Sequence, residues 1–408
     1  QLNRLIDSAL VDNLTLQQAA ARLDQARAVA AREGAALRPT LSANASAEAQ
    51  RQSERENAPS SRETYTAGLA AAYEIDLWNR LRSQRSAAAD RAEAARFDRD
   101  TAALSVTAEL TLRYFEWLAQ NERLQLLHAQ VRRNRDAAQL LVRRYANGAA
   151  SALDVFQQDQ VVAATESLIP AEVARQAVLE HTMAVLLGAP PQSPPPLASR
   201  PLPGLPPLPD AGLPVALLSR RPDVQATAAR LRESLRLETA ARADRLPALR
   251  LTASAAYSSE DLASLFDNWA ANLLAGLTAP LLDGGRRTAE VDRTVAVVRE
   301  RVAAYRETIL NAVRDVQDAL VREHYQSQTV TALEKQLHAA EKTYAESLQQ
   351  YAQGVESYLP VITAELRAQE LRRSLIQAHL QLLTYRTSLY RALGGDWASI
   401  LNGTTRPH

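Results

Sequence analysis

Two stretches of the sequence are versions of one another: Arg143-Arg-Tyr-Ala-Asn-Gly-Ala-Ala-Ser-Ala-Leu-Asp154 and Gln349-Gln-Tyr-Ala-Gln-Gly-Val-Glu-Ser-Tyr-Leu-Pro360. They lie 206 residues apart and share Tyr, Ala, Gly, Ser and Leu at corresponding places. A second match, at a shift of 208 residues, aligns the segments that begin at Arg38 and Leu246. A repeat that recurs through both halves predicts that the chain is built from two copies of one structural unit.

Each half contains two segments in which apolar and polar residues alternate. They run over about 40–50 and 63–74 in the first half, and over about 247–258 and 268–280 in the second. Such alternation predicts strands with one apolar face, and roughly ten residues is also the length of a membrane-spanning β-strand. By strand pattern alone, two ordinary soluble hairpins remain an alternative.

Each half also contains a long stretch without Pro or Gly. These stretches run over about 81–145 and 287–351, and at about 1.5 Å per residue each predicts a helix of roughly 98 Å. Their apolar residues recur at intervals of three and four, from Leu124 to Tyr145 and from Val330 to Tyr351. This heptad spacing predicts coiled-coil packing. The helices taken alone also fit a rod or bundle with no transport role.

Shorter helices complete the first half. Helical spacing of apolar residues is found over 15–38 and again over 153–187. Pro170 lies inside the second of these, and because proline lacks a backbone N–H it is expected to kink that helix. Each half therefore reads helix, strand, strand, long helix, helix.

The predicted boundaries follow from this order. The first repeat covers 1–187 and the second covers 215–393. Between them, 188–214 holds 11 of the 19 prolines and predicts an irregular connector. Residues 394–408 form a C-terminal tail.

Composition and charge exclude several functions. The chain has 408 residues and no cysteine, which excludes disulfide scaffolds and thiolate zinc sites. Its net charge is +1, and basic and acidic residues are interleaved along the predicted helices, so the sequence shows no concentrated basic face that could bind nucleic acid. No phosphate-binding glycine loop or catalytic motif is found. Pairs such as Glu334/His338 and Asp315/Asp318 fit polar helix faces, so we expect no enzyme activity, metal or cofactor.

Because the chain starts at Gln1 without Met, we expect that a leader has been removed.

The number of strands limits how they can enter a membrane. Single-chain membrane barrels start at about eight strands, and an open sheet in lipid leaves edge N–H and C=O groups unsatisfied at several kcal/mol each. If these strands enter a bilayer, several chains must share a barrel: two chains would give a filled interior, and three would give room for a channel. On that condition, the fold class is an α+β membrane protein with two repeats.

Five motifs carry a resemblance to a known family. They are Tyr73-Glu-Ile-Asp-Leu-Trp-Asn-Arg-Leu-Arg82, Gly148-Ala-Ala-Ser-Ala-Leu-Asp154, Gly212-Leu-Pro-Val-Ala-Leu-Leu-Ser-Arg-Arg-Pro-Asp-Val224, Ala279-Pro-Leu-Leu-Asp-Gly-Gly-Arg286 and Leu389-Tyr-Arg-Ala-Leu-Gly-Gly-Asp-Trp397. Over essentially its whole length the sequence resembles the TolC-like outer membrane factors, most closely the lipoprotein-type subset that serves resistance–nodulation–division pumps. Members of that subset are often lipidated on an N-terminal Cys, which this sequence lacks.

The resemblance implies a homotrimer in the outer membrane of a Gram-negative bacterium. Three chains would form a 12-stranded β-barrel in outer-membrane lipid and a 12-helix α-barrel that extends through the periplasm. The implied function is an exit duct for drugs or other small molecules, with a periplasmic adaptor protein and an inner-membrane efflux transporter as partners and multidrug resistance as the outcome. The alternative is a coiled-coil interaction protein of the envelope without a pore.

The resemblance also implies roles for the two glycine turns. It places adaptor docking at the periplasmic tip, on Gly148, Ser151, Leu153, Gly354, Ser357 and Leu359. Candidates for the aperture at this tip are Asp154, Asp159, Tyr358, Leu359, Ile362, Thr363 and Glu365. Related channels often carry an acidic residue at the place of Thr363, so two alternatives stay open. Either Glu365 supplies the acidic group, or only Leu359 and Ile362 narrow the opening.

Overall fold

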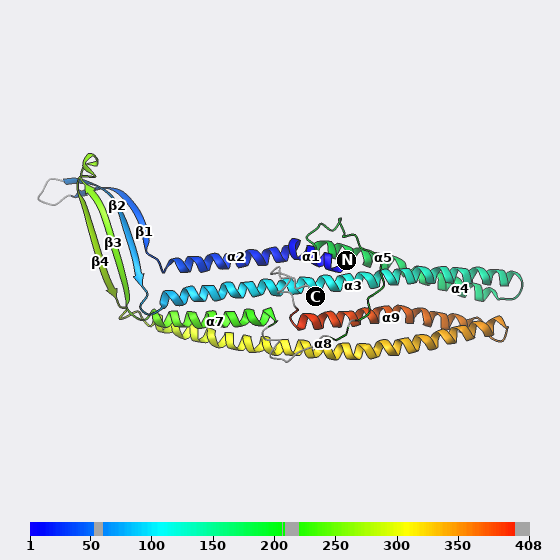
Figure 1. Ribbon diagram of the computed structural model, residues 1–408. Helices are drawn as coiled ribbons and strands as arrows, with labels where there is room; N and C mark the ends of the chain where they lie inside the picture. Colours follow the sequence, from blue (N-terminus) through cyan, green and yellow to red (C-terminus); the bar gives the residue numbers. More distant parts are fainter. Residues whose placement is uncertain (53–59, 206, 209–219, 396–408) are drawn as a thin grey trace, which may run out of the picture. The chain divides into compact units, whose positions relative to one another are not determined.

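The computed structural model describes residues 1–52, 60–205, 207–208 and 220–395, which are mostly helical with four strands (Figure 1). The chain divides into two compact units. Unit 1 comprises Gln1–Ala19, Arg99–Pro222 and Ile309–His408, and unit 2 comprises Ala20–Asp98 and Asp223–Thr308. Each unit therefore takes segments from both halves of the sequence. Parts of the predicted connector, of the motif that starts at Gly212 and of the C-terminal tail lie outside the described residues.

The four strands of unit 2 form one antiparallel sheet in the order β1-β2-β3-β4 (Figure 1). Their bounds are Thr40–Gln52 for β1, Ser60–Ile75 for β2, Ala248–Ser259 for β3 and Trp269–Thr278 for β4. A short 3-10 turn, Leu262–Ser264, lies in the loop between β3 and β4. Strands from the two sequence halves are thus joined between β2 and β3.

The strand register places most of the large apolar residues of the four strands on one face, with Leu274 on the other. Leu41 is opposite Ala71, Leu69 is opposite Ala255, and Ala253 is opposite Leu273. Since side chains alternate between the faces of a sheet, matched apolar positions share a face across every strand pair. Leu273 keeps 80% of its surface exposed and Leu41 keeps 72%. The described chain therefore leaves this apolar face largely uncovered.

The helical part of unit 2 consists of segments of four helices. These are α2 (Leu14–Ala35), α3 (Arg80–Ala146), α7 (Pro222–Ala243) and α8 (Arg286–Ala352), of which α3 and α8 continue into unit 1. Ala87 in α3 and Ala226 and Ala229 in α7 are each 2% exposed or less. Such small side chains allow neighbouring helices to pack closely. Arg232 of α7 adds ion pairs to Asp90 and Glu93 of α3.

Aspartates cap both long helices where they leave the sheet. The Asp76 carboxylate accepts hydrogen bonds from the N–H groups of Leu81 and Arg82, at 3.1 and 2.9 Å. In the second half, Asp283 accepts the N–H of Arg287 at 3.2 Å and also pairs with its guanidinium. A carboxylate at a helix N-terminus satisfies free N–H groups and interacts favourably with the helix dipole. Both repeats therefore begin their long helix in the same way.

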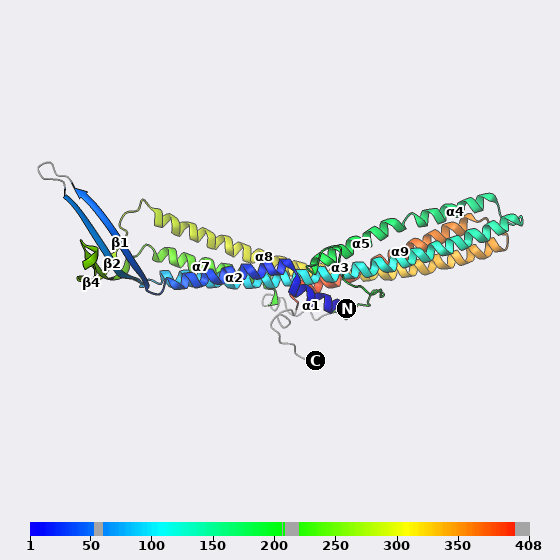
Figure 2. The same cartoon turned by 90° about the horizontal axis from the view of Figure 1, so that it is seen from above.

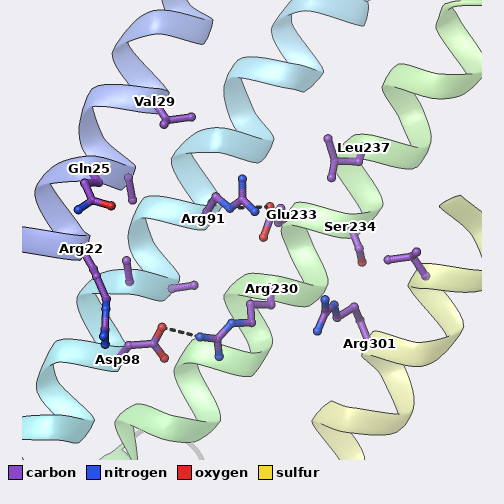
Figure 3. Close-up of a pocket in the computed structure, with 14 residues that line it drawn as sticks. Arg22, Gln25, Val29, Arg91, Asp98, Arg230, Glu233, Ser234, Leu237 and Arg301 are labelled. Carbon is purple, nitrogen blue, oxygen red and sulfur yellow. Dashed lines mark hydrogen bonds and ion pairs between the residues drawn. The ribbon is translucent and has the colours of Figure 1, made fainter. Parts of the chain in front are cut away.

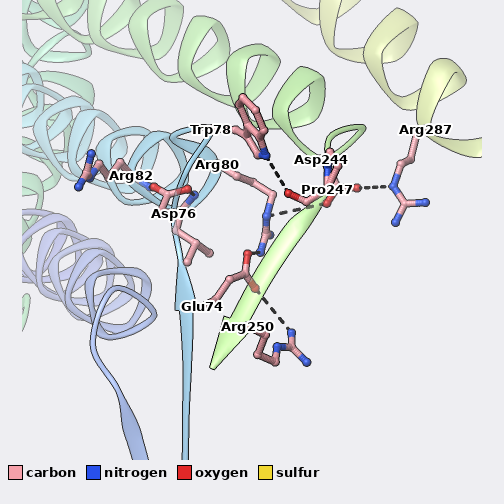
Figure 4. A network of polar contacts seen from close by, with 10 residues as sticks. Glu74, Asp76, Trp78, Arg80, Arg82, Asp244, Pro247, Arg250 and Arg287 are labelled. Carbon is pink, nitrogen blue, oxygen red and sulfur yellow. Dashed lines mark hydrogen bonds and ion pairs between the residues drawn. The ribbon is translucent and has the colours of Figure 1, made fainter. Parts of the chain in front are cut away.

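A polar network connects these caps to the strands (Figure 4). Arg80 donates to Glu74 at 2.5 Å, and Arg250 of β3 lies 3.6 Å from the same carboxylate. The Trp78 indole N–H donates to the carbonyl oxygen of Pro247 at 2.7 Å. The network joins the end of β2 to the start of β3, and so it fixes the junction between strands and helices.

Unit 1 contains the remaining helices. They are α1 (Leu2–Asp12), α4 (Ala152–Glu166), α5 (Ile169–Leu186) and α9 (Leu359–Ala392). Its largest apolar cluster joins α1, α3 and α5, with Leu110 and Met183 fully buried and Trp117 4% exposed. None of the described helices has an apolar stretch long enough to cross a bilayer.

Two helix predictions are corrected by the structure. The helix expected over 15–38 ends at Ala35, and a separate helix, α1, precedes it. The helix expected over 153–187 is not kinked inside: it stops at Glu166 and a new helix starts at Ile169. Pro170 then lies in the first turn of α5, where its missing N–H costs no hydrogen bond.

The first predicted heptad seam is more fully buried than the second, although the first ends on exposed Tyr145 and the second begins and ends on buried Val330 and Tyr351. Leu127, Asn134 and Leu141 of α3 are at most 2% exposed. In α8, Leu333 and Leu337 at the matching spacing are only partly buried. The two repeats therefore have the same seam but differ in how much of it this chain covers.

Gly68 and Gly276 offer a matched test of the sheet, because they are equivalent in the repeat. A methyl group at Gly68 would lie 2.6 Å from the Cβ of Ala256, whereas one at Gly276 would meet nothing within 4 Å. We expect Gly68→Ala to cost about 1–3 kcal/mol through overpacking, and Gly276→Ala to be neutral or to stabilise by up to about 1 kcal/mol. Urea unfolding in detergent measures both. Equal midpoints for the two variants would contradict the close approach at Gly68.

Candidate functional site

The two helix-to-helix turns of unit 1 lie side by side (Figures 1 and 2). One joins α3 to α4 and the other joins α8 to α9. Gly148 and Gly354 have φ of +71° and +76°, so both adopt the left-handed conformation expected after a long helix. The N–H of Ala149 donates to the Arg144 carbonyl oxygen at 2.8 Å, and the N–H of Val355 to that of Gln350 at 3.0 Å. These bonds close the two helix ends in the same way.

The starts of α4 and α9 differ, because Pro360 stands at the place that Asp154 has in the first repeat. Ser151 caps α4: its hydroxyl accepts the N–H of Asp154 at 3.1 Å, and the Asp154 carboxylate accepts the N–H of Ser151 at 3.0 Å. This reciprocal pair is a capping box. In α9 the N-cap is Tyr358, which makes no side-chain capping bond, and Ser357 is exposed. Asp154 therefore has a structural role at the tip.

An apolar and aromatic cluster packs the two turns together. Its buried members are Leu141, Val161, Tyr351, Tyr358, Val361 and Ile362. The rings of Tyr351 and Tyr358 are 4.9 Å apart, and the Arg144 guanidinium lies 4.6 Å from the Tyr351 ring centre. Offset aromatic pairs and cation–π contacts each add to the stability that burial provides. The cluster connects all four helices that meet at the tip.

Behind this cluster lies a buried chain of polar side chains. The Tyr358 hydroxyl donates to Gln158 Oε1 at 2.9 Å, and Gln158 Nε2 donates to the Asn134 carbonyl oxygen at 3.0 Å. Gln369 Nε2 donates to both Asn134 Oδ1 and Glu365 Oε1, at 2.9 and 3.0 Å. Asn134 and Gln158 are fully buried. This network joins α3, α4 and α9, and because its polar groups are paired it specifies one arrangement of these helices.

The sequence prediction missed Asn134, Gln158 and Gln369. One signal was present for Asn134, which is the polar member of the predicted heptad seam. A polar residue at a seam position commonly fixes helix register. No comparable signal marks Gln158 or Gln369, because their partners come from distant parts of the sequence.

The structure divides the aperture candidates into two groups. Leu359 is 56% exposed, and Thr363 and Asp159 are also exposed, while Asp154 is half-buried. Tyr358, Ile362 and Glu365 are buried, at 4, 7 and 8% exposure.

Helix periodicity explains this division. Positions 358, 362 and 365 follow one inward stripe of α9, and positions 359, 363 and 366 follow the adjacent outward stripe. Ile362 and Glu365 face the helices of their own chain, and their assignment to the aperture stays a prediction. Leu359 and Thr363 are the α9 candidates that remain at the surface.

Glu365 carries a carboxyl group with a raised pKa. Burial raises the pKa, and the hydrogen bond from Gln369 and the positive charges of Arg133 and Arg372 lower it without cancelling that effect. Burial also raises the pKa of Tyr358, with the negative charge of Glu365 as the second cause. The ionised form of Glu365 is therefore disfavoured at the tip. Among the described residues, no group of three His, Cys, Asp or Glu side chains is placed to hold a metal ion.

The fold is similar to that of solved outer-membrane channels. VceC from Vibrio cholerae matches the structure with a TM-score of 0.90 and 27% identity, over 97% of this chain and 96% of VceC. The MtrE outer membrane channel of Neisseria gonorrhoeae matches with a TM-score of 0.88 and 26% identity, over 97% of this chain and 89% of MtrE.

Residues 5–189 and 213–395 match the outer membrane efflux protein family, and the chain belongs to this family. The pyoverdine export outer membrane protein OpmQ of Pseudomonas aeruginosa is 31% identical over 424 residues, which cover 100% of this chain and 87% of OpmQ. The resemblance inferred from the sequence motifs is thus confirmed, and the function is efflux at the outer membrane.

Tyr358 and Tyr351 form a matched pair for testing the polar network. Tyr358→Phe leaves the buried Gln158 Oε1 without its donor and is expected to cost about 1–3 kcal/mol. The Tyr351 hydroxyl is buried without a hydrogen bond of normal geometry in the described part of the chain, and its pKa is raised by burial first and by Asp154 second. We expect Tyr351→Phe to change stability little. Thermal unfolding measures both variants, and equal losses would contradict the assigned role of Tyr358.

Glu365→Gln tests the pH dependence of the tip. Because the folded-state pKa is raised, the stability contributed by Glu365 is complete below its unfolded pKa and is lost as pH rises through the folded value. The glutamine keeps an acceptor for Gln369 Nε2 and carries no charge. We expect slower hydrogen exchange over α4 and the start of α9 than in the wild type at neutral pH, and a smaller difference at acidic pH. Glu370→Gln, at an exposed position on the same helix, serves as the control.

Proposed function

We propose that three copies of this chain share one barrel and form an exit duct through the outer membrane. The observation that carries this proposal is the sheet. It has an uncovered apolar face in register over four strands, and β1 and β4 are its edges. In lipid the edge N–H and C=O groups need partners, and neighbouring copies of the same sheet supply them. Three sheets give twelve strands, enough to enclose a channel.

The other face of the sheet suits a water-filled interior. It carries Asn44, Thr252, Ser254 and Asn272, with Ser254 opposite Asn272, while Thr252 is opposite the apolar Leu274. Outward apolar and inward polar residues are the arrangement of membrane barrels that conduct solutes. Small organic molecules are the proposed cargo. The name of OpmQ refers to pyoverdine export, which supports this class of cargo.

The helical part is proposed to continue the duct as an α-barrel with twelve helices. The seam of α8 supports this assignment. Leu333 packs against Val330, Ala378 and Leu382, and both Leu333 and Leu337 keep part of their surface for a neighbouring copy to cover. The two-repeat division, 1–187 and 215–393, joined by the connector 188–214 and followed by the tail 394–408, is retained as part of the proposal. The two separate segments matched by the family support it.

Replacing lipid-facing and interior-facing residues by Arg tests the barrel. Leu273→Arg is expected to cost about 2–4 kcal/mol if the position is near the bilayer midplane. Asn272→Arg, its neighbour on the other face, is expected to be tolerated. The measurements are the amount of protein in the outer membrane and its mass by light scattering in detergent, expected at about three times 44.7 kDa for the wild type and for Asn272→Arg. Equal tolerance of both changes, or a monomer in the membrane, would refute the shared barrel.

The two glycine turns are the proposed docking site for a periplasmic adaptor, which links the duct to an inner-membrane transporter. Gly148, Ser151, Leu153, Gly354, Ser357 and Leu359 form this tip. Leu153 and Leu359 are exposed at 62% and 56%, so both offer apolar surface to a partner. The exposed candidates Leu359, Thr363 and Asp159 are the proposed aperture residues. Tyr358, Ile362 and Glu365 are buried, and they pack α9 against the other helices of the chain.

Gly148→Asp and Gly354→Asp separate docking from assembly. A side chain at these left-handed positions costs roughly 1–2 kcal/mol, and neither position has another atom within 4 Å of the added Cβ. We therefore expect normal trimers with reduced adaptor crosslinking and reduced export. Gly276→Ala, far from the turns in the sequence, is the control. Normal crosslinking and export would remove the turns from the docking site, and loss of the trimer would show a purely structural role.

A further inference from the structure

A cavity of about 560 Å³ lies within unit 2, on one face of four helices (Figure 3). Figure 3 shows segments of α2, α3, α7 and α8 side by side, and all four contribute residues to the walls. The volume is within the range of roughly 300–1,000 Å³ that is usual for small-molecule sites. No residue of this cavity belongs to the sheet or to the two glycine turns, so the function proposed above leaves it unexplained.

The cavity has an excess of positive charge. It is lined by Arg22, Arg91, Arg230 and Arg301 and by two acidic residues, Asp98 and Glu233. This makes a net charge of +2 in a cavity of a chain whose total charge is +1. Such a local concentration of arginines attracts anions.

Two of the four arginines are largely free to contact a ligand. Arg91 pairs with Glu233 at 3.4 Å, and Arg230 pairs with Asp98. Arg301 makes one ion pair, at 3.8 Å, with its helix neighbour Glu300. Arg22 makes no hydrogen bond or ion pair with the residues that the structure describes.

The centre of the cavity is Glu233, which three arginines surround. Burial raises the pKa of its carboxyl group, and the charges of Arg91, Arg301 and Arg230 oppose that rise. The Glu233 side chain keeps only 18% of its surface exposed, so water has limited access to it. Electrostatic interactions are stronger in such surroundings than in open solvent.

Apolar side chains form the rest of the wall beside Arg301. Val297 is on α8, one turn from Arg301, and Leu237 is on α7, one turn from Glu233. Val29 and Ala94 extend this surface over α2 and α3. The combination of an apolar wall and guanidinium groups suits a ligand with an apolar body and a carboxylate, because the planar guanidinium binds carboxylates through two parallel hydrogen bonds.

We propose that this cavity binds an organic anion with an apolar body, such as an aromatic carboxylate, with Arg301 as the main contact for the anionic group. Arg230 and Arg91 shift toward the ligand from their acidic partners, and Val297 and Leu237 cover its apolar part. We place the face that holds this cavity on the inner wall of the duct, a step that rests on the proposed function. The site then retains anionic cargo briefly during transit.

Binding of 2-naphthoate to the full-length protein in detergent tests the proposal, with saturation-transfer NMR as the readout. The neutral 2-naphthamide and the cationic 2-naphthylmethylamine are the comparison probes, because all three share the apolar body. We expect saturable binding of naphthoate and much weaker binding of the other two. Equal binding of all three probes would mean that only the apolar wall or the micelle is detected, and the anion site would be refuted.

Three variants test whether the charges of the cavity control naphthoate binding. Arg301→Gln is expected to weaken naphthoate binding at least tenfold, and Glu233→Gln is expected to strengthen it severalfold by removing a competing negative charge. Arg299→Gln, an exposed arginine on the same helix that does not line the cavity, is expected to bind like the wild type. Unchanged binding in Arg301→Gln would show that these arginines are simply a solvated, ion-paired face.

Conductance in planar bilayers separates this inference from the function on which it rests. Wild type and Arg301→Gln are both expected to form conducting channels, since Arg301 belongs neither to the sheet nor to the tip. Conducting wild-type channels without a naphthoate site would refute only the anion site. A wild type that binds naphthoate and never conducts would refute the duct and leave the site in place.

Discussion

The requirement that the peptide groups and apolar side chains of the four-stranded sheet find partners is the constraint on which the rest of the structure depends. The sheet carries Leu41, Leu69, Leu273 and other apolar residues in register on one face, and the described residues leave that face largely uncovered. Strands β1 and β4 are its edges, and each is paired on one side only among the described residues. In the proposed trimer, lipid covers the apolar face and the neighbouring copies continue the hydrogen bonding. The network around Glu74, Arg80 and Trp78 then transmits the position of the strands to the long helices.

The duplication preserved local geometry and allowed long-range contacts to diverge. Asp76 and Asp283 cap the N-termini of the two long helices in the same way. Gly148 and Gly354, which follow the C-termini of these helices, both have a positive φ. By contrast, Tyr145 is 52% exposed and its equivalent Tyr351 is 8% exposed. The aspartate caps of the long helices and the glycine turns depend on a few neighbouring residues, so both copies keep them, whereas the capping box of α4 is lost in α9, where Pro360 replaces its aspartate. Burial depends on which helix lies opposite, and opposite helices differ between the two halves.

The tip combines an aromatic cluster with a buried polar network, and the two have different physical effects. Burial of Tyr351, Val361 and Ile362 supplies stabilisation that many side chains could provide. The bonds among Tyr358, Gln158, Asn134 and Gln369 require particular donors and acceptors in one arrangement. An unpaired buried polar group is costly, so this network disfavours alternative helix packings. Glu365 adds a dependence on pH, because its ionised form is disfavoured by burial.

The sequence by itself determined the types of element, the repeat, the two faces of the strands and the glycine turns. Each of these depends on residues within a few positions of one another, whose spacing or conformational range has a direct local consequence. Only the tertiary structure decided that Leu359 and Thr363 face outward while Ile362 and Glu365 face inward. Helical periodicity separates these two stripes without indicating which one is covered, because the covering residues, such as Leu141 and Val161, come from distant segments. The arginines of the unit 2 cavity were brought together in the same way, from four helices that are far apart in the chain.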